Sequence, residues 1–166
     1  MKDKVLILNK AEIKHKIKRI AYQILENNID EKEIILAGIA KNGFELAKRL
    51  KAELEIISSI QPVLCEVKID KKNPLSKITT SLSPEEYKDK SIVLVDDVLN
   101  SGTTLIYGVR HFLSVPLKQF NTAVLVDRNH KKYPVKADFK GISLSTSLNE
   151  MVKLRFEKEN DRVELL

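Results

Sequence analysis

Residues 92–105 read Ile-Val-Leu-Val-Asp-Asp-Val-Leu-Asn-Ser-Gly-Thr-Thr-Leu, an apolar run that leads into two adjacent carboxylates and then into a small, hydroxyl-rich segment. This order predicts a buried strand that ends at Asp96 and Asp97, followed by a turn that opens a helix. The start of such a helix presents unpaired backbone N–H groups and the positive end of the helix dipole, while Gly102 allows close backbone approach. The segment therefore predicts a phosphate site at the beginning of the helix.

The two carboxylates need a different role, because they would repel a bare phosphate. They can accept hydrogen bonds from sugar hydroxyls, or they can hold Mg²⁺ directly or through water. A ligand that carries ribose, phosphate and a metal satisfies both halves of the segment. The alternative is a buried strand of an open α/β sheet whose loop happens to be acidic, since many such strands end in one acidic residue. Two carboxylates at a fixed distance from Ser-Gly-Thr-Thr are much rarer.

Residues 92–105 resemble the phosphoribosyl pyrophosphate (PRPP) signature of the type I phosphoribosyltransferases. In that family the acidic pair hydrogen-bonds the ribose 2′ and 3′ hydroxyls, and the loop after it binds the 5′-phosphate. The resemblance assigns catalytic, ribose-binding and metal-holding roles to Asp96 and Asp97, with the metal held directly, through water or through ribose. It assigns PRPP binding to the loop residues Asn100, Ser101, Gly102, Thr103 and Thr104. It also implies Mg²⁺ as the cofactor, on the pyrophosphate and ribose oxygens.

The loop Gly38-Ile39-Ala40-Lys41-Asn42-Gly43 joins a predicted strand over 33–37 to a predicted helix through 44–54. Its glycines allow backbone N–H groups to turn toward an anion, and Lys41 adds a cation. Alone it is an ordinary strand-to-helix turn, but beside the signature it resembles the family's pyrophosphate loop. That resemblance implies a catalytic role for Lys41, PRPP contacts from Asn42 and Gly43, and a cis peptide bond between Ala40 and Lys41.

Asp70-Lys71-Lys72-Asn73 occupies the place of the family's flexible loop, which closes over PRPP and excludes water. Exclusion matters because the transition state resembles an oxocarbenium ion that water would capture. In this interpretation Lys71 and Lys72 bind PRPP and neutralise the pyrophosphate as it leaves. The alternative is a solvated lysine pair at the tip of a hairpin.

A second resemblance extends over nearly the whole chain. Asp127-Arg128-Asn129-His130, followed by Tyr133-Pro134-Val135-Lys136-Ala137-Asp138, is similar to the pattern of the pyrimidine-operon attenuation proteins (PyrR), which are also uracil phosphoribosyltransferases. In that group this segment recognises the base in a small hood. The resemblance therefore assigns base binding to Asp127, Arg128, His130 and Lys136.

The departures from that group bear on substrate and on RNA. The attenuation proteins usually carry tyrosine at the position of Asn100 and arginine at that of Thr103, and the RNA-binding relatives carry threonine and histidine at the positions of Lys18 and Tyr22. Purine enzymes commonly place an aspartate where this chain has Asn100. An amide cannot act as a base there, so Asn100 weakens a purine assignment.

The remaining patterns predict the fold class. Asn9 and Glu12 form the side-chain pattern of a capping box before a helix that ends at Asn27-Asn28, and Ser83 to Glu86 predicts one short helical turn. Strands alternate with helices, which predicts a parallel sheet with right-handed crossovers. Residues 151–156 and 163–166 predict a C-terminal hairpin. We expect one α/β domain over residues 1–166, a parallel sheet flanked by helices, with a small hood and that hairpin.

Composition sets wider limits. The chain is 43% hydrophobic, has Cys65 as its only cysteine, and carries a net charge of +6. A single cysteine excludes an internal disulfide. The sequence has no apolar run of about eighteen residues and no signal-peptide pattern, so we expect a cytoplasmic protein without a membrane partner. The basic charge suits a protein that handles polyanions, and pyrophosphate substrates and RNA explain it equally well.

Three hypotheses follow. The first is a phosphoribosyltransferase that moves the 5-phosphoribosyl group from PRPP to a nucleobase, with uracil favoured, and releases pyrophosphate. The second is a PRPP- and nucleotide-sensing RNA-binding regulator of pyrimidine genes with weak catalysis. The third is a purine-salvage enzyme. The family resemblance also implies a homodimer. If the chain binds RNA, we expect weak electrostatic contacts from Lys10, Lys14, Lys18, Arg19 and Lys136.

Overall fold

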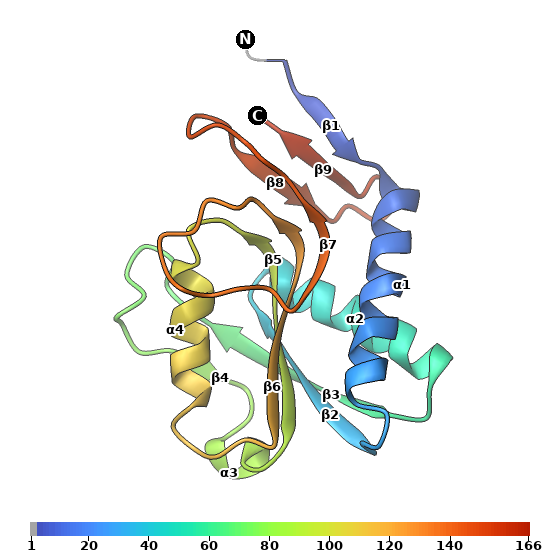
Figure 1. The fold of residues 1–166 in the computed structure, drawn as a ribbon, viewed down its shortest axis with the longest axis vertical. Coiled ribbons are helices and arrows are strands. Elements are labelled where there is room, and N and C mark those ends of the chain that lie inside the picture. Colours follow the sequence, from blue (N-terminus) through green and yellow to red (C-terminus); the bar gives the residue numbers. More distant parts are fainter. Residues whose placement is uncertain (1–2) are drawn as a thin grey trace.

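Two sheets and four helices make up residues 3–166, the part of the chain that this computed structural model describes (Figure 1). In chain order the elements are β1 (Val5–Leu8), α1 (Lys10–Asn27), β2 (Glu33–Ile39), α2 (Asn42–Ile57), β3 (Gln61–Lys68), β4 (Thr79–Thr80), α3 (Pro84–Tyr87), β5 (Ser91–Leu99), α4 (Thr103–Phe112), β6 (Gln119–Asp127), β7 (Phe139–Ser143), β8 (Val152–Arg155) and β9 (Arg162–Leu165).

The larger sheet has the strand order β4-β3-β2-β5-β6-β7. All of its pairings are parallel except that of β4 with β3. Both faces are covered: α1 and α2 lie on one side, and α4 lies on the other (Figure 1). The predicted α/β fold with a parallel sheet flanked by helices is therefore confirmed.

Alternate residues of the central strands belong to two separate cores, as the two-residue period of a strand requires. On β2, Ile34 and Leu36 pack with α1 and α2, whereas Ile35 and Ala37 pack with the side that holds α4. Because both faces are buried, the strands read as continuous apolar runs. The same burial places the carboxyl end of β5, with its acidic pair, at the edge where ligands bind in parallel sheets.

Helix boundaries follow the predicted caps. The Asn9 side chain accepts from the Glu12 backbone N–H at 2.9 Å, and the Glu12 carboxylate accepts from the Asn9 N–H at 2.8 Å. The Asn28 N–H donates to the Leu25 carbonyl where α1 ends. Ser83 and Glu86 form a second capping box at α3. Local side-chain chemistry therefore sets where these helices begin.

The smaller sheet has the order β1-β9-β8 and is antiparallel. We call this sheet, together with residues 128–138 and 144–150 on either side of β7, the hood. The predicted C-terminal hairpin is present as β8 and β9. The third strand, β1, comes from the other end of the chain (Figure 1), and the sequence patterns did not predict this pairing. Among residues 3–166, no helix combines the length and apolar character that a membrane crossing requires.

Candidate active site

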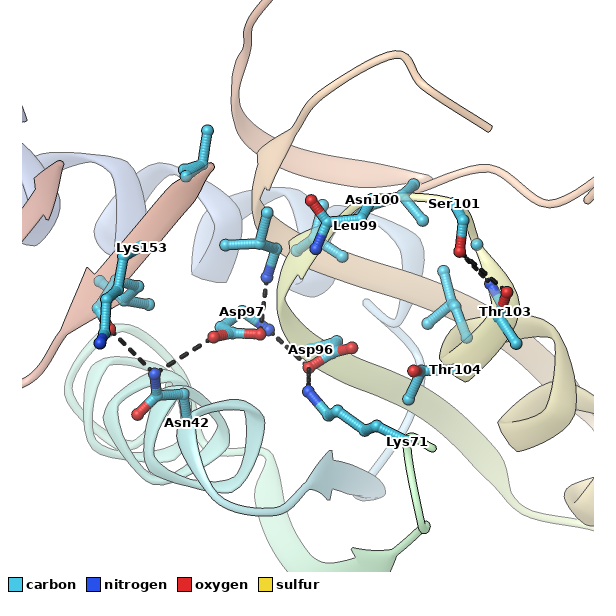
Figure 2. Close-up of a pocket in the computed structure, with 16 residues that line it drawn as sticks. Asn42, Lys71, Asp96, Asp97, Leu99, Asn100, Ser101, Thr103, Thr104 and Lys153 are labelled. Carbon is cyan, nitrogen blue, oxygen red and sulfur yellow. Dashed lines mark hydrogen bonds and ion pairs between the residues drawn. The ribbon is translucent and has the colours of Figure 1, made fainter. Parts of the chain in front are cut away.

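A cavity of about 300 Å³ opens at the carboxyl end of β5 (Figure 2). It lies between the start of α4, the start of α2 and β8. Its volume falls within the range of small-molecule sites. Its lining includes nine of the residues that the sequence singles out for PRPP and metal: Asn42, Lys71, Asp96, Asp97, Asn100, Ser101, Gly102, Thr103 and Thr104.

The acidic pair forms the floor of the cavity. Asp96 is only 4% exposed, and its Oδ1 accepts from the Asp97 backbone N–H at 2.9 Å. Burial, and then the neighbouring Asp97 carboxylate, raise the pKa of Asp96 well above its usual range. The ammonium of Lys71, 3.8 Å from Oδ1, opposes this pKa shift. Hydrogen-bond donors or a cation supplied by a ligand would therefore stabilise the ionised form of Asp96.

A metal ion fits this site only if the ligand brings part of its coordination shell. Among residues 3–166, no group of three or more His, Cys, Asp or Glu side chains is placed to hold a metal. Mg²⁺ is commonly bound by one or two carboxylates together with water and substrate phosphates. Asp96 and Asp97 supply the carboxylates, so the donor set matches an ion that enters with a phosphorylated ligand.

The loop after the acidic pair has the geometry expected of a phosphate site. Gly102 has φ of +85° and immediately precedes α4, which has no acidic residue in its first turn. The hydroxyls of Ser101 and Thr103 lie 2.8 Å apart, and Thr104 also lines the cavity. Backbone N–H groups and hydroxyls therefore gather at the positive end of a helix, where the Thr103 N–H donates to Ser101 Oγ at 3.3 Å.

The hood covers this loop from outside. The Ser101 carbonyl accepts from the N–H groups of Lys132 and Tyr133, at 2.7 and 3.2 Å. A Cβ built on Gly102 would lie 2.6 Å from Cγ1 of Val135. Glycine is therefore needed at position 102 for two reasons: the backbone is left-handed, and the hood packs too closely for a Cβ.

Gly38 and Gly43 are required for close packing and not, as predicted, for turning backbone N–H groups toward an anion. The cis peptide between Ala40 and Lys41 is present. Among the described glycines, only Gly102 has a positive φ, so Gly38 and Gly43 are not needed for an unusual backbone. A Cβ on Gly38 would lie 2.5 Å from Phe44 Cα, and one on Gly43 would lie 2.7 Å from the Val95 carbonyl oxygen. Both glycines therefore let α2 begin in close contact with β2 and β5.

Asn42 and Lys41 point to different places. The Asn42 amide nitrogen lies 3.2 Å from Asp97 Oδ2 and 3.0 Å from the Leu154 carbonyl oxygen, so it joins the acidic pair to β8 (Figure 2). Lys41 is exposed and lines separate hollows beside the cavity, one of them shared with Lys68 and Lys77. The structure therefore places Asn42 at the acidic pair and Lys41 outside it.

Lys71 and Lys72 also differ. The Asp70 carboxylate accepts from the backbone N–H groups of Lys72 and Asn73, at 2.9 and 3.3 Å, and so fixes a tight turn. This turn directs Lys71 toward Asp96 (Figure 2), whereas Lys72 is exposed and does not line the cavity. Only the first lysine of the pair reaches the acidic floor.

None of the four residues assigned to base binding lines the cavity. Asp127 is buried, accepts from the Asn129 N–H at 3.0 Å, and is near the ammonium groups of Lys131 and Lys140. Lys136 is largely exposed and pairs with Asp138. These contacts organise the hood.

Arg128 and His130 both reach Thr146. The Arg128 guanidinium donates to the Thr146 hydroxyl, and the His130 ring pairs with the Thr146 carbonyl. Arg128 also donates to Asn100 Oδ1 at 2.9 Å, which connects the hood to the loop over residues 100–102.

Residues 152–154 complete the cavity, although no sequence motif indicated a role for them. Val152 and Leu154 are buried, and Lys153 between them is exposed. The alternating apolar and charged pattern predicts a strand, but it carries no sign of a site because the contact depends on how the hood folds over the sheet.

A parallel sheet whose central strand leads through an acidic pair and a glycine- and hydroxyl-containing loop into a helix is typical of the type I phosphoribosyltransferase fold. The family profile described as the phosphoribosyl transferase domain matches residues 6–153. The chain therefore belongs to the phosphoribosyltransferase family.

Among curated relatives, the bifunctional protein PyrR of Bacillus pumilus is 34% identical, and the alignment covers 98% of this chain and 97% of the relative. The bifunctional protein PyrR of Bacillus subtilis is 33% identical over 98% of this chain and 97% of its own length. The resemblance expected from residues 127–138 is thus confirmed.

Solved structures share the fold at lower identity. A hypoxanthine-guanine phosphoribosyltransferase from Bacillus anthracis has a TM-score of 0.74 and 18% identity, with 97% of this chain and 99% of that chain covered. The hypoxanthine phosphoribosyltransferase of Trypanosoma cruzi has a TM-score of 0.77 and 17% identity, with 95% and 94% covered. At this identity the likeness concerns the fold alone.

Proposed function

We propose that this phosphoribosyltransferase transfers the 5-phosphoribosyl group from PRPP to N1 of uracil. The C1′–oxygen bond to pyrophosphate breaks, the C1′–N1 bond forms, and the N1 proton leaves, which yields UMP and pyrophosphate. The observation that carries the proposal is a cavity that joins two carboxylates to a phosphate loop at the start of a helix. PRPP carries both a ribose diol and a 5′-phosphate on one molecule.

In this proposal the protein acts mainly by positioning and electrostatics. Asp96 and Asp97 accept from the ribose hydroxyls, and residues 101–104 donate to the 5′-phosphate. Lys71 neutralises the departing pyrophosphate, whereas Lys41 and Lys72 lie outside the cavity. Bound Mg²⁺ would supply positive charge to the pyrophosphate oxygens, and the two carboxylates are the groups that would hold it. The turn at Asp70 aims Lys71 correctly for this role.

Two features favour uracil as the acceptor. The chain is similar to PyrR over almost its full length, and residues 127–138 carry the pattern that resembles the pyrimidine-specific group. Asn100 stands where purine enzymes commonly have an aspartate, and an amide cannot take a proton from a purine ring. Neither feature depends on the solved structures, because at their low sequence identity they support the fold and not the substrate.

Labelled PRPP offered with uracil, hypoxanthine, guanine and xanthine in parallel tests the proposal. We expect UMP as the main product, with equimolar pyrophosphate. A purine nucleotide as the main product would refute the uracil assignment and indicate purine salvage. No product from any base, from protein that is folded by circular dichroism, would refute the enzyme assignment.

An RNA-binding role is the second candidate, which the resemblance to the pyrimidine-operon attenuation proteins implies and the exposed lysines of α1 favour. Lys14 and Lys18 are exposed, but Arg19 donates to the carbonyls of Lys140 and Gly141 and so anchors α1 to β7. We expect contacts with phosphates rather than bases. Retention of labelled RNA on a filter over a range of salt concentrations tests this role.

A further inference from the structure

Asn100 lies where the phosphate loop meets the hood. It follows β5 directly, lines the cavity, and precedes the hydroxyl residues 101–104. Its amide oxygen accepts from Arg128 Nη1 at 2.9 Å. Figure 2 shows the amide oxygen turned away from Asp96 and Asp97 and the amide nitrogen on the side that faces them.

Arg128 is held by a dense set of acceptors. Its Nε and Nη2 lie 3.1 and 2.9 Å from the Thr146 hydroxyl, and Nη2 also lies 2.6 Å from the Glu150 carbonyl oxygen. A guanidinium has five N–H donors in a rigid plane. Since most of them are already used within the protein, Arg128 is fixed in orientation and has little capacity left for a base.

This arrangement determines how the Asn100 amide is oriented. A guanidinium only donates, so the group that faces Arg128 must be the amide oxygen, and the reverse orientation would place two donors in contact. The Asn100 Nδ2 is therefore presented to the cavity as a donor. Its two N–H bonds can be satisfied by an acceptor atom on the ligand and not by another N–H.

We propose that Asn100 is a specificity-determining residue that donates to a carbonyl oxygen of the acceptor base, and that Arg128 is the positioning residue that holds its amide in this orientation. The inference rests on the proposed phosphoribosyl transfer. It narrows the acceptor to bases that place an oxo group within reach of the Asn100 Nδ2. It reassigns Arg128, which the sequence resemblance placed in base binding.

The base is a better partner for Nδ2 than the 5′-phosphate. The hydroxyls of Ser101 and Thr103 and the start of α4 already form the phosphate site on one side of Asn100. On its other side Asn100 contacts Arg128, which belongs to the segment that resembles the base-binding hood. Asn100 thus stands on the boundary between the two subsites and turns its donor away from Arg128 into the shared space.

Replacing single atoms in the substrate tests the contact. Sulfur is a weak acceptor, so 2-thiouracil or 4-thiouracil lacks one good carbonyl acceptor. We expect the wild-type protein to prefer uracil over one of these analogues by about tenfold in kcat/KM. Asn100→Ala should abolish that preference, and Arg128→Lys should reduce it. Asn27→Ala, at an exposed position at the end of α1, is the matched control and should keep it.

The preference is a ratio between two bases at the same PRPP concentration, so a general loss of folding or of PRPP affinity does not move it. The inference is overturned if the wild-type protein does not discriminate, or if Asn100→Ala keeps the full preference. If no base yields product, the proposed reaction fails. The same ratio is then read from calorimetric Kd values for UMP and its thio analogues, where a preference lost in Asn100→Ala supports the contact and an unchanged one refutes it.

Discussion

Replacing Asp96 with asparagine should stabilise the free protein while impairing its use of PRPP. Asp96 is almost fully buried, and burial and Asp97 both raise the pKa of its carboxyl group. Its ionised form is therefore disfavoured in the fold. The amide oxygen introduced by Asp96→Asn could still accept from the Asp97 N–H, as Oδ1 does now. The variant thus removes a buried charge and keeps a hydrogen bond.

The direction of the pH dependence follows from the raised pKa of Asp96. The folded state binds this proton more tightly than the unfolded state, so the stabilising contribution is complete below the ordinary pKa of 3.8 and is lost as pH rises through the folded-state pKa. The neutral variant has no such loss. Its advantage in Tm should therefore grow from acidic to neutral pH, with each kcal/mol appearing as about 2–4 °C for a domain of this size.

Ligand should reverse the order of stability. Loss of one charge-assisted hydrogen bond to ribose costs roughly 1.5–3 kcal/mol, or about ten- to over a hundredfold in kcat/KM. Wild type binds PRPP more tightly than the variant, and tighter binding raises the Tm more. Wild type should therefore be the more stable protein with saturating Mg²⁺ and PRPP. Differential scanning calorimetry with and without ligand measures both effects.

The ion pair with Lys71 can be separated in the same experiment by a double-mutant cycle of Asp96→Asn and Lys71→Ala. The Lys71 side chain is 51% exposed, so the coupling should be at most about 1 kcal/mol. The reasoning is refuted if Asp96→Asn lowers the Tm of the free protein at neutral pH, or if the variant has wild-type kcat/KM.

Three further predictions follow from the loops and the basic helix. Gly102→Val should abolish calorimetric PRPP binding and also lower the Tm, because the residue has a positive φ and faces Val135; normal PRPP affinity would place the phosphate elsewhere. Gly43→Ala should lower the Tm without any strain in φ, because its Cβ would contact the Val95 carbonyl; an unchanged Tm would contradict this. RNA binding should fall by roughly 0.7–0.9 log units per neutralised phosphate per decade of salt and show little preference for an attenuator hairpin over a scrambled one in mobility shifts; tight hairpin-specific binding at physiological salt would contradict it.

Local patterns predicted the parts of the fold that local chemistry controls. The capping box at Asn9 and Glu12 and the turn at Ser83 gave correct helix starts, because the partners lie three residues apart in the chain. The apolar runs gave the parallel sheet. The pairing of β1 with β9 could not be predicted, since strand register between the two ends of the chain leaves no local signal.

The candidate site likewise has a part that local sequence predicts and a part that depends on tertiary contacts. Residues 96–104 run without interruption from the end of β5 into α4, so the cavity floor follows from sequence. The role of Gly43 was misread as backbone freedom because its actual constraint, contact with β5, joins segments far apart in the chain. The same holds for Arg128, whose partners Asn100 and Thr146 come from two other loops, and for the 152–154 lining. Tertiary contacts of this kind appear only once the hood is placed over the sheet.

A crystal structure of the protein with Mg²⁺ and PRPP would show which residues contact each group of the substrate. We expect the 5′-phosphate at the start of α4, within hydrogen-bond distance of Ser101, Thr103 and Thr104, and the ribose hydroxyls on Asp96 and Asp97. We expect the pyrophosphate on the side of Lys71. A 5′-phosphate bound at any other place, with the carboxylates not in contact with ribose or metal, would contradict the proposed site.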